Sequence, residues 1–436
     1  MLGLKPYQWL AIFAAWCGWG FDVFDSLLFS FVAPTCVPLL LGLKPGTVDA
    51  HSATLLWTGI LTGILLIGWA VGGFIFGLVA DRIGRKRTLL ITVLIYSIGT
   101  ALCAAAMDIW QLAVFRAVAS LGIGGEWAVG AALVAETVPE SRRVEAGALM
   151  FTASPLGFAL AGVVNYRVAG VWLASSPETA WRVVFLFGLI SASLAIFVRL
   201  FLREPERWMH AVETSRRPQA SELFSPSIRR RTWSGLFTAV MALLTFWSIS
   251  AFSPIVAANL ASDHALANGF SATATRALAE HWKAEASNWF CFGGLLGTFL
   301  AIPLSRRLSR RATFAVYYTL AFGAILGLFG LDLAPYERVC GFFALGIGVY
   351  GIFSVFTFYL PELFPTRIRA LGAGVCYNSG RALTAGGTFI VGALSAQAGG
   401  STSALLSILL WVAVIPAVAL VGCRWITETR GVPLPD

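Results

Sequence analysis

Long apolar stretches alternate with short polar segments along the whole chain, and charged residues, proline or glycine bound each stretch. Each stretch is about as long as the roughly 20 residues that an α-helix needs to cross the core of a bilayer. The pattern therefore predicts an all-α membrane protein with 12 transmembrane helices, at approximately 9–33, 53–80, 88–106, 109–135, 146–172, 182–202, 233–260, 287–305, 312–332, 339–361, 370–397 and 403–425.

The one long polar segment, 203–232, follows the sixth stretch, so we expect domains at 1–202 and 233–436 joined by a cytoplasmic linker. Three motifs of the first half recur in the second half at an offset of about 225 residues: Leu121-Gly-Ile-Gly124 as Leu345-Gly-Ile-Gly348, Glu136-x-x-Pro-x-x-x-Arg143 as Glu362-x-x-Pro-x-x-x-Arg369, and Asp81 to Arg87, more weakly, as Arg306 to Ala312. Such a repeat predicts two pseudo-symmetric six-helix bundles and a transporter whose substrate site lies between them.

Composition and charge agree with a lipid environment. Hydrophobic residues make up 58% of the chain and charged residues 12%, whereas a soluble domain has about a quarter charged residues. With both termini in the cytoplasm, 22 of the 31 Lys and Arg residues fall on the cytoplasmic side and five in outer loops, as the positive-inside rule requires. The net charge of +9 then faces the anionic inner leaflet of the cell inner membrane, and we expect no nucleic-acid partner.

The sequence predicts no metal, no cofactor and no enzyme active site. The seven cysteines show no CxxC or Cys/His spacing, and no phosphate-binding loop is present, so an ion gradient is the expected energy source. Residues 261–286 are expected to form the largest outer loop, where His264 and His281 lie among carboxylates at a spacing that fits no particular metal site.

The turn from Gly77 to Arg87 joins the second and third stretches on the inner side. Its Gly84 permits a tight turn, and Asp81 at a helix end can pair with arginines and with a neighbouring helix N-terminus. This turn resembles the signature loop of the major facilitator superfamily. In the second copy, Arg306 stands in the place of Asp81 and Ser309 in the place of Gly84. The resemblance implies gating roles for Asp81, Arg82, Gly84, Arg85, Glu136, Arg143, Glu362 and Arg369.

Further motifs resemble the proton-coupled metabolite symporters of the sialate and lactate type, and next the aromatic-acid proton symporters. They are Phe21-Asp22-Val-Phe-Asp25, Gly125-Glu126-Trp127 and Cys376-Tyr377-Asn378-Ser-Gly-Arg381, although the aromatic-acid group usually shows Asp-Gly-Tyr/Phe-Asp in place of the first. The resemblance implies a monomer that imports a small organic anion with protons by alternating access. Proton-coupled efflux of amphipathic compounds and symport of a sugar-type metabolite are the alternatives.

Two carboxylates in the first stretch are candidates for proton coupling. Asp22 and Asp25 are three residues apart, so they project from neighbouring points of one helix face. Two carboxylates this close in a low-dielectric cavity should not both be ionised, and one of them would then hold a proton. Alternatively, one of them pairs with an arginine to order the bundle. Glu126 is a third candidate, as a gate, a proton site or a structural residue.

Arg381 is the candidate for binding the substrate anion. It lies eleven residues into its stretch, which is close to the bilayer midplane, with Tyr377 and Asn378 about one helical turn away. A guanidinium beside a hydroxyl and an amide makes a receptor for a carboxylate, because arginine is a planar, two-pronged donor. An ion pair with Asp22 or Asp25 is the alternative, and the two states can alternate within one cycle. Arg116 and Trp127 are further candidates for substrate contact.

Overall fold

The computed structural model describes residues 4–139, 142–200, 219–365 and 368–431, and in this part of the chain every regular element is a helix. The elements are α1 (Pro6–Leu40), α2 (Val48–Ile83), α3 (Arg85–Ala104), α4 (Ile109–Thr137), α5 (Arg143–Phe151), α6 (Ala153–Asn165), η2 (Tyr166–Trp172), α7 (Pro177–Leu200), η3 (Ala220–Phe224), α9 (Arg229–Ser250), α10 (Ser253–Ala267), α11 (Ala272–Arg307), α12 (Arg310–Gly330), α13 (Pro335–Glu362), α14 (Arg369–Gln397), α15 (Thr402–Trp411) and α16 (Val414–Gly422).

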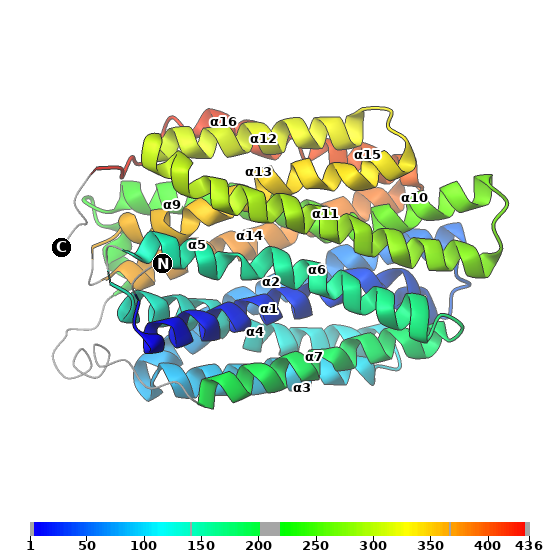
Figure 1. The fold of residues 1–436 in the computed structure, drawn as a ribbon, viewed down its shortest axis with the longest axis horizontal. Coiled ribbons are helices and arrows are strands. Elements are labelled where there is room, and N and C mark those ends of the chain that lie inside the picture. The colour runs from blue at the N-terminus through cyan, green and yellow to red at the C-terminus, as the bar shows by residue number, and fades with distance from the viewer. Residues whose placement is uncertain (1–3, 140–141, 201–218, 366–367, 432–436) are drawn as a thin grey trace.

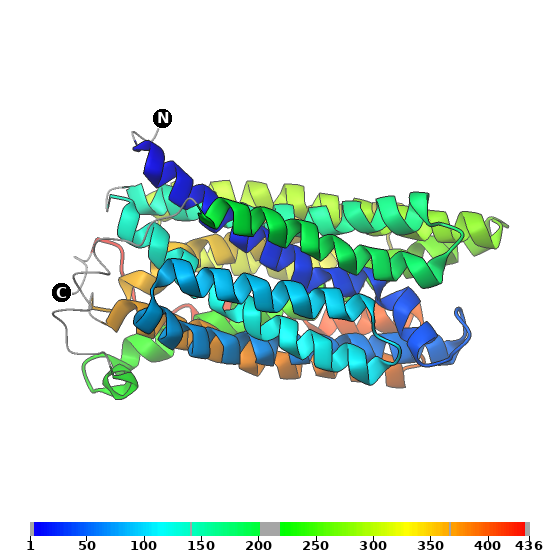
Figure 2. The same ribbon diagram turned by 90° about the horizontal axis from the view of Figure 1, so that it is seen from below.

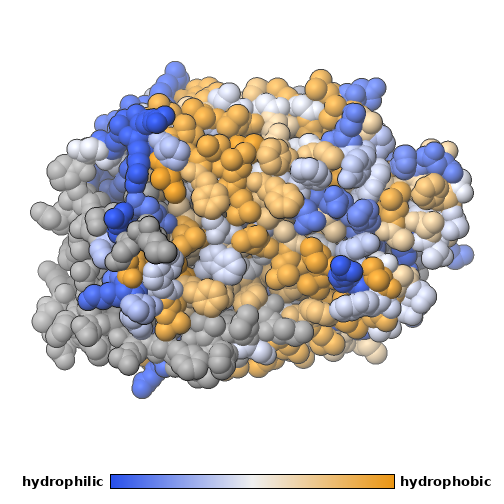
Figure 3. Space-filling model, viewed as in Figure 1, coloured by the Kyte–Doolittle hydropathy of each residue, from blue (hydrophilic) through white to orange (hydrophobic). Residues whose placement is uncertain are grey.

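These elements form the 12 membrane-crossing segments that the sequence predicts, and the all-helical fold is confirmed. Three segments are built from consecutive pieces, namely α5 with α6 and η2, α9 with α10, and α15 with α16. Among the described residues, nine helical segments are both long and apolar enough to cross a membrane by themselves. The long helices run side by side along one direction (Figures 1 and 2), and apolar side chains form a broad band between more polar ends on the face shown in Figure 3.

The prediction that residues 261–286 form a loop is wrong, because most of them are helical. Helix α10 continues to Ala267, and α11 begins at Ala272, where the hydroxyl of Ser271 caps the helix by accepting a hydrogen bond from Ala274 N at 3.3 Å. The two helices extend beyond their neighbours at the end opposite the termini (Figure 1). The polar residues of this stretch therefore lie on helices, and only a short turn joins them.

The first six membrane segments, from α1 to α7, form the N-terminal half, and the six from α9 to α16 form the C-terminal half. Helix α2 packs along α14 of the other half, and α6 packs against α11. Glycine makes the first contact close, because a Cβ atom added to Gly59 would lie only 2.7 Å from the carbonyl oxygen of Thr388. Small residues let helices approach each other closely in lipid, so the two halves meet over a large part of their length.

Candidate substrate and proton sites

A small cavity lies between the two halves. Its volume is about 30 Å³, and its walls come from both halves, with Trp19, Trp69, Phe246, Trp247, Tyr377 and Arg381 among the lining residues. A cavity needs roughly 10–15 Å³ to hold one water molecule, so this one has room for water but not for an organic acid. The carrier is closed around the candidate site, and substrate binding requires the halves or their side chains to move apart.

Arg381 of α14 is buried and lies over two aromatic rings. Its guanidinium carbon lies 4.0 Å from the ring centroid of Trp69, on α2 of the other half, and 4.4 Å from that of Tyr377. Its Nη1 donates a hydrogen bond to Asn378 Oδ1 at 3.1 Å. Because cation–π contacts hold the guanidinium, its plane is fixed beside the cavity. Tyr377 and Asn378 thus lie next to Arg381 as the helical spacing predicts.

The two carboxylates of α1 have different partners. Asp25 is buried inside the N-terminal half, where its Oδ2 accepts a hydrogen bond from Thr100 Oγ1 of α3 at 2.6 Å. Helix α7 packs against it, since a Cβ atom added to Gly188 would lie 2.9 Å from Asp25 Oδ1. Asp22 is also buried, and it interacts electrostatically with Arg381 of the other half. The two carboxylates therefore lie in different environments, Asp25 inside one half and Asp22 near a cation of the other half.

Arg116 of α4 also lies inside the N-terminal half, near Asp25. Its Nη2 donates to the carbonyl oxygen of Ser26 at 3.0 Å and its Nη1 to that of Asp25 at 3.4 Å, and its guanidinium carbon lies 5.4 Å from the ring centroid of Phe29. The sequence suggests a substrate contact for Arg116. The structure places this buried cation beside Asp25, and the described lining of the cavity does not include it. Its contact with the substrate stays a prediction.

Several candidates cannot be placed side chain by side chain. Seven candidates have side chains outside the described part of the structure, and their roles stay predictions: Glu126, Trp127, Asp81, Arg82, Arg85, Glu136 and Arg143. The backbone of Gly84 is described, and its φ of 102° lies in the region that favours glycine, at the junction of α2 and α3. The predicted tight turn is therefore present.

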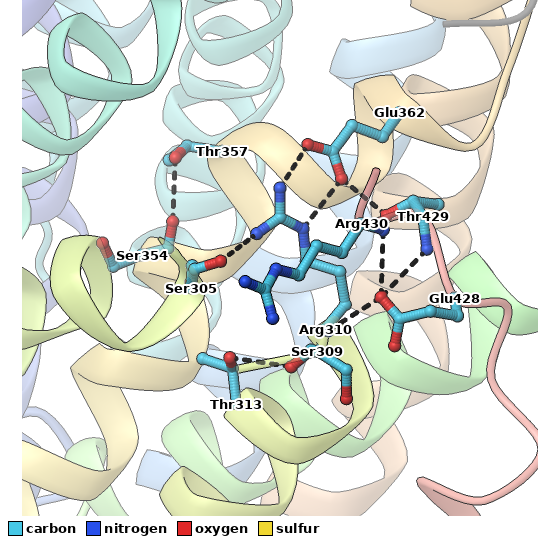
Figure 4. Close-up of polar contacts among 10 residues, drawn as sticks. All are labelled: Ser305, Ser309, Arg310, Thr313, Ser354, Thr357, Glu362, Glu428, Thr429 and Arg430. Atoms are coloured by element: carbon cyan, nitrogen blue, oxygen red, sulfur yellow. Dashed lines mark hydrogen bonds and ion pairs between the residues drawn. The ribbon is translucent and has the colours of Figure 1, made fainter. Parts of the chain in front are cut away.

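Glu362, a predicted gating residue, joins a polar network with residues of α12 and of the segment after α16 (Figure 4). Its carboxylate accepts two hydrogen bonds from Arg310, from Nε at 3.0 Å and from Nη2 at 2.7 Å, and one from Thr429 Oγ1 at 2.6 Å. Arg369, the second predicted gating residue of this motif, donates from Nε to the carbonyl oxygen of Pro361 at 3.0 Å. The motif thus ties the end of α13 to α12, α14 and the segment after α16.

Sequence reasoning missed the segment after α16. Glu428 accepts hydrogen bonds from the backbone N–H groups of Arg310 at 2.9 Å and Arg311 at 3.2 Å, and so caps the N-terminus of α12. It also accepts from the N–H groups of Thr429 and Arg430. Burial alone would raise the pKa of Glu428, but these four N–H groups together lower it. A lone glutamate near a chain end gives no sequence signal for such a capping role.

A comparison with known protein families identifies the architecture. The model of the Major Facilitator Superfamily matches residues 9–380. The chain belongs to this superfamily. It is therefore a multi-pass membrane transporter and not an enzyme, as the sequence predicts.

Three similar proteins illustrate the match. A "Probable 4-methylmuconolactone transporter" of Cupriavidus pinatubonensis is 30% identical over 99% of this chain and 93% of its own length. A niacin transporter of Acinetobacter baylyi is 26% identical over 87% of this chain and 85% of its own length. A crystal structure of a D-xylose–proton symporter, 18% identical, matches with a TM-score of 0.70 over 98% of this chain and all of the other. This last likeness shows the shared fold.

Proposed function

We propose that this transporter imports a small ring-bearing carboxylic acid together with protons, by alternating access, as a monomer in the cell inner membrane with both termini in the cytoplasm. The observation that carries the proposal is the buried guanidinium of Arg381, which lies over the rings of Trp69 and Tyr377 beside the cavity. A buried cation in lipid needs an anionic or polar partner. In the closed carrier Asn378 and Asp22 interact with Arg381, and a substrate carboxylate, whose geometry fits a two-pronged donor, can replace them.

The aromatic walls favour a ring over an open chain. Trp19, Phe246 and Trp247 line the cavity together with the two rings that stack on Arg381. Flat aromatic surfaces give large contact areas and preferred stacking geometries to another ring. The names of the relatives agree with this proposal, because 4-methylmuconolactone and niacin both contain a ring.

Proton coupling follows from competition for one cation. Asp22 interacts electrostatically with Arg381 in the closed carrier. A substrate carboxylate that binds Arg381 replaces Asp22 as its counter-charge, so the two carboxylates are not both stable as anions at the same site. Binding of the anion then favours uptake of a proton by Asp22, and the two cargoes travel together. Asp25, with Thr100 and Arg116 beside it, is the second proton-carrying candidate.

A thermal-shift experiment tests the substrate class. We expect benzoate and nicotinate to stabilise the purified transporter, whereas benzamide and nicotinamide, which keep the ring and lose the charge, do not. Lactate, which keeps the charge and lacks the ring, should stabilise it less. Equal stabilisation by the acids and the amides would contradict the carboxylate site. Stabilisation by amphipathic cations alone would favour the efflux alternative.

A further inference from the structure

A buried polar cluster bridges the two halves at the end of the molecule opposite the termini. On α11, Lys283 Nζ and Glu280 Oε2 form an ion pair at 2.6 Å, and the two side chains are only 2% and 5% exposed. Lys283 also donates to the carbonyl oxygen of Phe31 at 2.8 Å, and Asn165 Nδ2 donates to Glu280 Oε2 at 2.5 Å. We call Asn165, Glu280, Lys283 and the carbonyl of Phe31 the outer latch.

Both of the latter hydrogen bonds run from one half of the transporter to the other. Phe31 lies on α1 and Asn165 ends α6, both in the N-terminal half, whereas Glu280 and Lys283 lie on α11 of the C-terminal half. Directly after Asn165 the chain forms the π-helix η2, and a Cβ atom added to its Gly170 would lie 3.0 Å from Glu280 Cβ. Single π-helical turns occur frequently at functional sites.

The same helix carries a second contact between the halves at its other end. There Arg306 binds Glu145 of α5 at 2.5 Å, but the arginine side chain is 65% exposed. Exposed ion pairs contribute little to stability, because water and salt screen them. Buried, charge-assisted hydrogen bonds are considerably stronger. The outer latch is therefore the stronger of these two contacts, and the described structure favours a carrier that is closed on the outer side.

We propose that the outer latch is the gate that closes the outer route to the cavity. Outward opening separates Asn165 and Phe31 from α11, while Glu280 and Lys283, three residues apart on one helix, stay paired with each other. The ion pair is kept when the halves part, and water replaces the two lost hydrogen bonds. The latch thereby sets the equilibrium between closed and outward-open carrier, whatever the cargo is.

A reporter cysteine on the outer side tests this gate. Ser287 of α11 is buried against Gly162 of α6, so Ser287→Cys should react with a membrane-impermeant maleimide only when the outer side opens. Asn165→Leu removes one hydrogen bond between the halves and leaves the ion pair intact. We expect labelling of the reporter to become about tenfold faster in full-length protein in proteoliposomes without substrate, because a hydrogen bond to a charged group is lost. The parent protein without the reporter gives the background from the native cysteines.

A second variant and a second reporter keep the test decisive. The double variant Glu280→Met with Lys283→Met removes both charges together and should also speed labelling at the outer reporter. Asn259→Leu, at another buried asparagine near the middle of α10, is the matched control and should not. Thr357→Cys, on α13 against Gly147 of α5, reports opening at the other end and should be labelled no faster. Unchanged labelling of Ser287→Cys in both latch variants, or equal acceleration at both reporters, overturns the proposal.

Discussion

Replacing Arg381 by lysine separates the geometry of the anion site from its charge. The Arg381→Lys variant keeps one positive charge near the cavity but loses the planar group that stacks on Trp69 at 4.0 Å and on Tyr377 at 4.4 Å. An ammonium group cannot present two parallel N–H donors to one carboxylate. The variant should therefore bind a ring-bearing acid through a single hydrogen bond, from a side chain whose position Trp69 and Tyr377 no longer fix.

The expected loss follows from the contacts that disappear. A hydrogen bond to a charged group contributes about 1.5–3 kcal/mol, and weakened cation–π contacts add about 0.5 kcal/mol or more. A loss of about 2 kcal/mol corresponds to a roughly 30-fold larger dissociation constant for benzoate or nicotinate. The measurement is isothermal titration calorimetry on the purified variant beside the wild type.

Arg338→Lys is the matched control, because Arg338 is another buried arginine of the C-terminal half. Its Nη2 donates to the carbonyl oxygen of Leu331 at 2.9 Å, and its Nη1 donates to that of Leu328, so it caps the end of α12. This control should lower thermal stability and leave the affinity for the acid unchanged. If Arg381→Lys binds the acid as tightly as the wild type, Arg381 does not hold the substrate.

Four further substitutions test the proton sites and the polar network. Replacing the proton-carrying carboxylate, by Asp22→Asn or Asp25→Asn, should abolish accumulation driven by an inward proton gradient. Counterflow should be preserved, because a neutral amide mimics the protonated state. A double variant that still accumulates substrate would contradict the assignment. Glu362→Gln removes the charge and one acceptor of the two-pronged pair with Arg310. It should lower stability by roughly 1–3 kcal/mol, which chemical or thermal unfolding in detergent would measure. Because folding lowers the pKa of Glu428 below its ordinary 4.5, its ionised form stabilises the fold above that pH and the contribution is lost as the pH falls further. Glu428→Gln should therefore lower the melting temperature at neutral pH, and the difference from wild type should shrink below pH 4.5; a difference that does not change with pH would show that the carboxylate charge is not involved.

The sequence predicts the helical architecture well, because a hydrophobic stretch of about 20 residues is typical of a membrane-spanning helix. It also places Tyr377 and Asn378 beside Arg381, since helical periodicity decides which side chains share a face. It is wrong about 261–286, where polar residues suggest a loop. Glu280 and Lys283 neutralise each other on one buried face of α11, so their charges do not prevent the burial of that face.

The sequence does not predict the contacts between segments that are distant along the chain. Asn165 meets Glu280 only because α6 packs against α11, and no periodicity encodes that pairing. The position of the Asp25 carboxylate is a similar case, because a hydrogen bond from Thr100 of α3 holds it. Asp22 and Asp25 share a helix face, but this does not mean that they share partners. The small size of the cavity is a property of the closed arrangement of both halves, which a linear pattern does not contain.

Uptake into proteoliposomes tests the central claim most directly. Radiolabelled nicotinate or benzoate is supplied outside vesicles that contain the full-length transporter, with the outer solution more acidic than the lumen. We expect the acid to accumulate above its external concentration relative to protein-free vesicles, and a protonophore to abolish this excess. An excess that persists without the proton gradient, or a gradient that drives the acid out of the vesicles through the transporter, would contradict proton-coupled import.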